Sequence, residues 1–500
     1  MPFLAESLHH PCSVQIDPVF PMLAIHIDFN CAAFTRKTLS SILHFAASYG
    51  YDAVLWEVED KIQWETCPEC VSPDAFSKAE FREILAEAKS LGLAPIPLLQ
   101  TFGHAEYILS HKPYDAWREV PEKKNCYCVS NPEVRDFLKR FLHEYLEVFG
   151  DDVRLFHLGG DEVYSFCKCP VCSRRDRMEL YSEHLNAVAG ELLARGIRPC
   201  CWADMILSCG GDSISRFIPR DFVLWHWSYT YGTPGVQPDY VLKARRLKEE
   251  GYDVFFCAAA ESAGDAPFLS LFSRHAPNIA VCAAFAREEK LDGFCVTSWS
   301  IRGTSKTAQF PLFALGARCL KAPFADAEAE FAAVLRELVG DVSPDALYRL
   351  SEWSGGNGFE GRQWNVYKDG IPPMAGRREW IISENHKYTK GYPDAPIAKH
   401  EKRIAEIRAA LDELRALPGQ TAVGEALLAG GSLHERLLRS IVAVERGERL
   451  PAIPFLETMR FYAREQTDWS AFNMARCVWG VLDGRYANPY DPNVRIETWN

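Results

Sequence analysis

The sequence has 500 residues, of which 48% are hydrophobic and 24% are charged, and its formal net charge is -12 at pH 7. This composition is typical of a globular protein, and the length accommodates one barrel of about 250 to 300 residues plus a smaller domain. The negative charge argues against nucleic acid and anionic membranes as partners, because both would repel the chain.

The first residues contain neither the basic segment nor the apolar run of a signal peptide, and no later segment is predicted to span a membrane. The 17 cysteines are an odd number spread over a long chain, which favours free thiols over a disulfide framework. We therefore expect a cytoplasmic protein. Residues 1–21 carry Pro11, Pro18 and Pro21 and are predicted to form an irregular N-terminal leader.

Strand and helix patterns alternate along the next 300 residues or so. The expected strands are residues 22–30, 53–60, 94–102, 155–159, 198–204, 222–227, 253–259 and 293–299. The expected helices are residues 38–49, 77–91, 131–149, 177–195, 240–249, 278–288 and 310–320. This order predicts an α/β fold with a (β/α)8 TIM barrel over residues 22–325. A doubly wound open sheet is the alternative, since strand order cannot be read from the sequence.

Beyond residue 325 the alternation stops and only helical spacing of apolar residues continues. The expected helices are residues 327–339, 400–416, 423–446 and 454–476. They predict a C-terminal, mainly helical domain over residues 326–500. We expect this domain to pack on the barrel or to form a homodimer interface.

Residues 154–164 hold the most informative motif of the chain. An apolar run ends in His157, and Gly159 and Gly160 then precede the adjacent acids Asp161 and Glu162. The glycines allow a kinked backbone and the close approach of another group, for which a ligand is the natural candidate. One acid could protonate a leaving group while the other stabilises a developing positive charge, as glycoside cleavage requires. The alternative is that the acids cap the helix that follows.

The segment from His157 to Glu162, His-Leu-Gly-Gly-Asp-Glu, resembles the signature of glycoside hydrolase family 20, the β-N-acetylhexosaminidases. The first two-thirds of the chain is similar to the hexosaminidase D-like branch of that family. The resemblance implies that Glu162 is the general acid/base and that Asp161 stabilises an oxazolinium intermediate formed by the substrate's acetamide. No protein nucleophile and no catalytic cofactor are then needed. The predicted activity is that of a retaining exo-β-N-acetylhexosaminidase, which removes terminal GlcNAc or GalNAc from a small glycan or glycoside.

Two alternatives remain at this point: a barrel glycosidase for a different or anionically substituted sugar, and a non-catalytic sugar-binding protein on the same fold. Polar and aromatic residues at the predicted strand ends suit a sugar in all three cases, because a pyranose has an apolar face and a rim of hydroxyls. The candidate substrate-binding residues are His104, Trp202, Asp204, Trp225, Trp227, Tyr229, Trp299 and Arg302. Any single tryptophan among them could instead belong to the core.

The resemblance implies a role for several of these residues. His104 would reach the sugar hydroxyls or the acid pair, Trp202 and Asp204 would line the acetamide pocket, and Tyr229 would bind the acetamide carbonyl. Trp299 would form the pocket floor.

The chain departs from the family pattern in two places. Phe29 and Asn30 stand where an arginine commonly grips the outer hydroxyls, and Arg302 stands near the usual position of an acid. We therefore expect the acetamide chemistry to persist while the preference between GlcNAc and GalNAc stays open. Arg302 could contact an anionic or axial group of the sugar, or form a rim ion pair with Asp265.

Cysteines cluster in three loops that follow successive predicted strands. Two Cys-Pro-x-Cys segments resemble the half-sites of a structural zinc, which takes four ligands in a tetrahedron. The predicted ligands are Cys67, Cys70, Cys169 and Cys172. Unmetallated thiols packed in the loops are the alternative. A catalytic zinc is not expected, because four thiolates leave no position for water.

Overall fold

The computed structural model describes residues 21–209, 214–230, 239–262, 265–300, 303–352, 395–480 and 482. Eight parallel strands pair in sequence order and close into a barrel, as β8 pairs with β1. The strands are β1 Met22–Asp28, β2 Ala53–Glu57, β3 Ala94–Leu98, β4 Leu155–His157, β5 Arg198–Trp202, β6 Val223–Trp227, β7 Asp253–Glu261 and β8 Gly293–Ser298. The prediction of a (β/α)8 barrel is confirmed, and the closed strand order excludes the open sheet.

The barrel interior is filled by small and large side chains from facing strands. Ala24, Ala53 and Cys257 share this interior with Trp225 and Phe255. A Cβ atom on Gly293 would overlap the ring of Phe255, so the ring occupies space that only a glycine leaves free. The interior is therefore a packed core, and chemistry is left to the loops at the strand ends.

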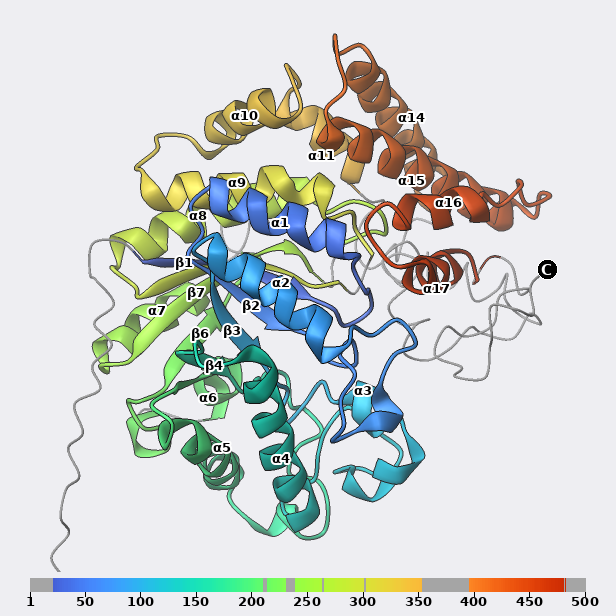
Figure 1. Cartoon of the computed structure of the whole chain (residues 1–500). Coiled ribbons are helices and arrows are strands. Elements are labelled where there is room, and N and C mark those ends of the chain that lie inside the picture. The colour runs from blue at the N-terminus through green and yellow to red at the C-terminus, as the bar shows by residue number, and fades with distance from the viewer. Residues whose placement is uncertain are drawn as a thin grey trace, which may run out of the picture.

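Helices surround the barrel (Figure 1). They are α1 Arg36–Ser48, α2 Lys78–Ser90, α3 Glu106–Leu109, α4 Pro132–Phe149, α5 Arg177–Leu193, α6 Asp204–Cys209, α7 Asp239–Glu249, α8 Phe272–Glu288 and α9 Phe310–Lys321. Side chains at the N-caps stabilise several helix starts: Ser77 forms a capping box with Glu80, and Asp176 accepts a hydrogen bond from the backbone of Glu179. Helix α8 begins at Phe272 and contains Pro277, whereas the predicted helix began only after this proline.

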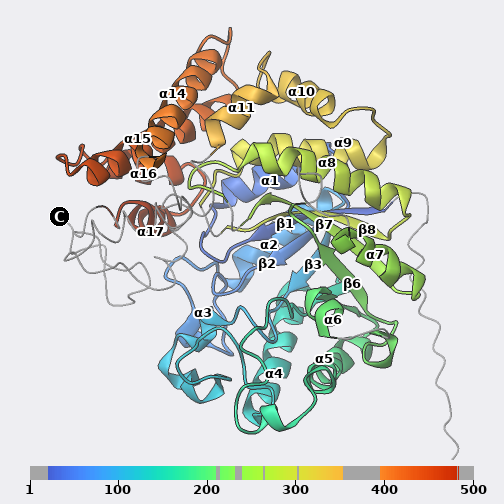
Figure 2. The same ribbon diagram turned by 180° about the vertical axis from the view of Figure 1, so that it is seen from behind.

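The C-terminal part is helical, as expected, and lies beside α8 and α9 (Figure 2). It contains α10 Ala327–Leu338, α11 Pro344–Ser351, α14 Ala395–Arg415, α15 Ala422–Arg446, α16 Phe455–Tyr462 and α17 Asp468–Trp479. The single helix predicted for residues 454–476 is in fact two helices, because Thr467 caps a new helix by accepting a hydrogen bond from the backbone of Ser470. Helix α11 was not predicted.

The turn between α16 and α17 contacts the rim of the barrel. Gln466 forms an isolated antiparallel bridge with Phe34, in the loop after β1, and the Thr467 N–H donates to the Ala33 carbonyl at 2.9 Å. The Glu465 carboxylate accepts hydrogen bonds from the backbone N–H groups of Lys306 and Thr307, after β8. Residues near the end of the described chain thus hold loops at the carboxyl ends of the first and last strands.

Among the described residues, no helix has the length and apolarity that crossing a membrane requires.

Candidate active site

The chain turns sharply after β4. Gly159, Gly160 and Glu162 all have positive φ angles, of 65°, 94° and 48°. A Cβ atom on Gly159 would overlap the side-chain amide of Gln100, and one on Gly160 would overlap the hydroxyl of Tyr181. The glycines thus admit neighbouring protein groups, and not the ligand that the sequence suggested. The turn also prevents the two acids from pointing to opposite faces as they would in a strand.

Asp161 and Glu162 have different surroundings. The side chain of Asp161 is 9% exposed, and its Oδ2 lies 3.4 Å from Nε2 of His104. Its Oδ1 is buried and accepts no hydrogen bond from the described residues. The side chain of Glu162 is 41% exposed and lies 3.8 Å from the same His104 nitrogen. One carboxylate is therefore held in place, and the other faces solvent.

His104 follows β3 and approaches both acids. Burial opposes the charged imidazolium, but the carboxylate of Asp161 outweighs this effect, with help from Glu106 and Glu162, and raises the pKa of His104 well above its usual value. A cationic His104 therefore lies beside the Asp161 carboxylate. The structure thus brings together three of the residues predicted from sequence.

Asp204 joins the same group. It is the first residue of α6, and its Oδ2 accepts a hydrogen bond of 3.0 Å from the backbone N–H of Glu162. Burial, followed by the charge of Asp161, raises the pKa of Asp204 to about 7. Asp204 therefore positions the backbone of Glu162, although the sequence predicted only a pocket-lining role.

Aromatic side chains lie at the ends of β6 and β8. The indole Nε1 of Trp299 donates to the hydroxyl of Tyr229 at 3.0 Å, and Tyr229 stacks on Trp227 at 5.1 Å between ring centroids. These three residues are half-buried. Trp202 is fully buried, 5.8 Å from Trp299.

Trp225 lies deeper than Trp227 on the same strand. It is fully buried and stacks on Phe255 at 4.4 Å. Trp225 therefore packs within the barrel core, as Trp202 does, and its role as a substrate-binding residue stays a prediction. Trp227, two residues further along the strand, is half-buried at the strand end.

Buried polar groups support the floor of the site. Glu57 lies 3.1 Å from Nε2 of His26 and accepts a hydrogen bond of 2.9 Å from Gln100. Asp28 accepts a hydrogen bond of 2.8 Å from the backbone N–H of Ser300. Burial raises the pKa of both acids to about 7 and lowers that of His26 to about 4.

Two residues singled out by the sequence, Phe29 and Asp265, take no part in this group. Arg302 lies outside the described residues. Phe29 is fully buried and packs against Phe34, so it does not replace the expected sugar contact. Asp265 lies 2.8 Å from His275, which gives its carboxylate a partner other than the predicted arginine.

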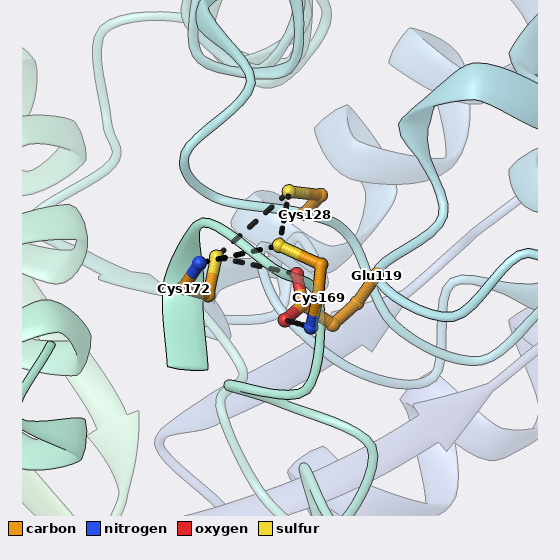
Figure 3. Close-up of side chains that lie close together, drawn as sticks. All are labelled: Glu119, Cys128, Cys169 and Cys172. Carbon is orange, nitrogen blue, oxygen red and sulfur yellow. Dashed lines mark hydrogen bonds between the residues drawn. The ribbon is translucent and has the colours of Figure 1, made fainter. Parts of the chain in front are cut away.

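A second group of reactive side chains lies in the loops after β3 and β4. The ligand atoms of Glu119, Cys128, Cys169 and Cys172 all lie within 4.8 Å of one another (Figure 3). Cys67 and Cys70 do not belong to this group. The predicted metal set is therefore wrong in those two members, because Cys67 caps the short 3-10 turn Pro68–Cys70, and both cysteines pack in the hydrophobic core.

A closed parallel barrel with paired carboxyl groups and tryptophans at the carboxyl ends of its strands has the architecture of the barrel glycosidases. Comparison with known families agrees: residues 34–261 match the family model described as glycosyl hydrolase family 20, catalytic domain. Over residues 34–261 the chain is therefore similar to this family, and it is also similar to hexosaminidase D proteins.

Two such relatives are the hexosaminidase D proteins of Homo sapiens and Bos taurus. The human protein is 27% identical over 301 residues, a match that covers 56% of this chain and 60% of the relative. The bovine protein is 27% identical over 251 residues, covering 48% of this chain and 71% of the relative.

Solved structures agree at the level of fold. The β-N-acetylhexosaminidase of Bacteroides fragilis superposes with a TM-score of 0.52 at 19% identity, covering 64% of this chain and 70% of that one. The chitobiase of Flavobacterium johnsoniae superposes with a TM-score of 0.53 at 14% identity, covering 92% of this chain and 78% of that one.

Proposed function

We propose that the protein is a retaining exo-β-N-acetylhexosaminidase that removes terminal GlcNAc or GalNAc by substrate-assisted hydrolysis. The observation that carries this proposal is the contrast between the neighbouring acids: a buried Asp161 beside cationic His104, and an exposed Glu162. Two adjacent carboxyl groups with such different surroundings are suited to different roles in one reaction. The family match and the names of the relatives support the same activity.

Asp161 would orient the substrate's acetamide. Its buried Oδ1 is an acceptor without a partner among the described residues, and such an atom is costly unless a ligand completes it. The acetamide N–H would donate to this oxygen. As the acetamide oxygen attacks the anomeric carbon, positive charge develops on the acetamide nitrogen, and the Asp161 carboxylate stabilises it.

Glu162 would carry the proton. In the first step it protonates the glycosidic oxygen while the bond from that oxygen to the anomeric carbon breaks and the oxazolinium ion forms. In the second step the Glu162 carboxylate takes a proton from a water molecule. The water oxygen attacks the anomeric carbon and opens the oxazolinium ring. The two displacements return the configuration of the substrate. The 41% exposure of the Glu162 side chain leaves room for the leaving group and for water.

Tyr229 would hold the acetamide carbonyl. An indole N–H can only donate, so the bond from Trp299 uses an acceptor site of the Tyr229 oxygen and does not engage its hydroxyl proton. Trp227 and Trp299 would offer ring faces to the apolar side of the sugar.

The proposal is tested with nitrophenyl β-glycosides of GlcNAc, GalNAc, their sulfated forms and glucose. We expect turnover of the N-acetyl sugars and none of the glucoside, which lacks the internal nucleophile. Comparison of the sulfated substrates with the others tests an anionic preference. Equal rates on the glucoside and the GlcNAc substrate would exclude substrate assistance, and binding without turnover would identify a sugar-binding protein instead.

Two variants assign the roles. Glu162→Gln should abolish turnover of substrates with poor leaving groups and retain part of the rate on dinitrophenyl substrates, which need no protonation. Asp161→Asn should lower kcat about 10²- to 10³-fold on all substrates, the usual cost of losing one transition-state stabilising group. An unchanged rate in Glu162→Gln would remove its assignment. The predicted cytoplasmic location and the homodimer interface stay predictions.

A further inference from the structure

Glu119, Cys128, Cys169 and Cys172 form a compact cluster from two separate loops. The Sγ atom of Cys128 lies 3.6 Å from that of Cys169 and 3.8 Å from that of Cys172. Oε2 of Glu119 lies 3.4 Å from the Cys172 Sγ. The three cysteines are free thiols, and all four side chains point toward one another (Figure 3).

These distances match the edges of a coordination tetrahedron around one zinc ion. A Zn–S bond of about 2.3 Å and tetrahedral angles place two sulfurs about 3.8 Å apart. A Zn–O bond of about 2.0 Å places a carboxylate oxygen about 3.5 Å from each sulfur. The distances between the sulfur atoms leave room for a single ion and not for a cluster of several iron atoms.

The carboxylate of Glu119 is oriented by its surroundings. Its Oε1 accepts hydrogen bonds from the backbone N–H groups of Lys168 and Cys169, at 2.7 and 2.9 Å, and its Oε2 is thereby turned toward the thiols. The side chain is 1% exposed, and no cationic side chain in the described ranges forms an ion pair with it. A buried carboxylate facing three thiols is costly unless a cation completes the group.

Further hydrogen bonds suit thiolates. The backbone N–H of Cys172 donates to Sγ of Cys169 at 3.3 Å, and the hydroxyl of Ser130 lies 3.0 Å from Sγ of Cys172. Hydrogen bonds of this kind, from nearby residues of the same chain, orient metal ligands and offset their negative charge. Three sulfur ligands favour zinc over magnesium or calcium, which prefer oxygen.

We propose that Cys128, Cys169, Cys172 and Glu119 bind one Zn²⁺ in a closed, structural site. The site fastens the loop after β3 to the loop after β4. Both loops also carry residues of the candidate active site. In the loop after β3, Cys126 forms a β-bridge with Gly103, which is next to His104. In the loop after β4, residues 167–172 follow Glu162. A bound ion would thus fix the distance between the elements that carry His104 and the two acids.

Metal content of the purified full-length protein, measured by mass spectrometry, tests the site directly. We expect about one zinc per chain, and a thermal midpoint that falls on dialysis against a chelator and recovers when zinc is restored. Cobalt substitution should give the intense visible bands of a tetrahedral site, with charge-transfer absorption from three thiolates. No metal, together with no change of midpoint on adding zinc, would overturn the proposal.

Variants identify the ligands. Cys128→Ser and Cys169→Ser should lose the stoichiometric zinc, and Glu119→Gln should weaken zinc binding by at least the 10- to 100-fold that loss of an outer-shell partner costs. Cys67→Ser, in the buried cysteine pair outside the cluster, is the matched control and should keep one zinc. Loss of zinc in Cys67→Ser with retention in Cys128→Ser would overturn the ligand set. If a variant fails to fold, the cobalt spectrum of the unaltered chain still counts the thiolates.

The effect on hydrolysis rests on the proposed function, but zinc binding does not. Zinc removal should lower kcat/KM up to about 100-fold, as small displacements of catalytic groups do. Stoichiometric zinc without hydrolase activity would support the metal site and contradict the proposed function. Hydrolase activity without bound zinc would support the proposed function and contradict the metal site.

Discussion

Nε2 of His104 lies 3.4 Å from Oδ2 of Asp161, although the two residues follow different strands of the barrel. His104 has a φ of 50°, in the left-handed region that side chains other than glycine seldom adopt. Strained backbone of this kind persists where the surrounding structure determines it, and it often accompanies functional sites. The contact therefore offers a direct way to test the site.

His104→Asn should lower kcat/KM by about 10-fold or more, because a hydrogen bond to a charged group contributes roughly 1.5–3 kcal/mol. Asparagine tolerates the left-handed backbone, so the fold should persist. The pKa of His104 is raised, so its contribution to stability is full at pH values below the ordinary histidine pKa. That contribution is lost as the pH rises through the raised value.

The stability difference between His104→Asn and the unaltered protein should therefore shrink at alkaline pH in thermal unfolding experiments. His143→Asn is the matched control, since His143 lies 3.2 Å from Glu191 on the surface. Equal losses of activity in both variants would show that His104 has no particular role.

Asp204→Asn should move the alkaline limb of the pH profile of kcat/KM to lower pH. Asp204 ionises near pH 7. Its negative charge then disfavours loss of a proton from Glu162, the proposed general acid. An asparagine oxygen can still accept the hydrogen bond from the backbone of Glu162, so the geometry is kept. The profile is measured with a nitrophenyl GlcNAc substrate, and an unmoved limb would contradict the coupling.

Glu57→Gln should flatten the dependence of stability on pH. The pKa of Glu57 is about 7 in the folded protein, above its ordinary value, so the folded state keeps a proton that the unfolded chain releases. Stability from this group is full below the unfolded pKa and is lost as the pH rises toward 7. Urea unfolding at pH 5, 6, 7 and 8 should show a steeper decline in the unaltered protein than in Glu57→Gln, where glutamine keeps the bond to Gln100.

Glu465→Gln should lower the free energy of unfolding by about 1–3 kcal/mol. Both carboxylate oxygens accept hydrogen bonds from backbone N–H groups, at 2.7 Å from Lys306 and 2.9 Å from Thr307. An amide would place its own N–H groups against one of these donors. Glu457→Gln, at an exposed ion pair with Arg436, should change stability by no more than about 0.5 kcal/mol. Similar losses in the two variants would contradict a specific role for Glu465.

The barrel could be predicted because apolar strands and amphipathic helices alternate with clear periods. The errors occur where one local rule competes with another. Pro277 is tolerated inside α8, although prolines commonly end helices. Residues 463–467 interrupt an otherwise helical pattern, because Thr467 offers a cap that the apolar spacing does not reveal.

The acid pair could also be predicted, since Asp161 and Glu162 are adjacent in a recognisable motif. The metal cluster could be predicted only in part. Cys169 and Cys172 lie in a Cys-Pro-x-Cys segment, but Glu119 is an isolated acid with no spacing signal, and only the folded loops bring it to the sulfurs. Trp225 and Trp227 share one face of a strand, so the sequence could not distinguish the fully buried residue from the half-buried one at the strand end.

The bridge between Phe34 and Gln466 joins positions that are translated far apart. During synthesis every barrel strand leaves the ribosome before Gln466 does. The loop after β1 therefore lacks its contact with Gln466 during most of elongation. A nascent barrel therefore has an incomplete rim until the helices at the far end of the chain arrive. Truncated chains that stop before α16 should yield a barrel that depends on chaperones, even though they contain all eight strands.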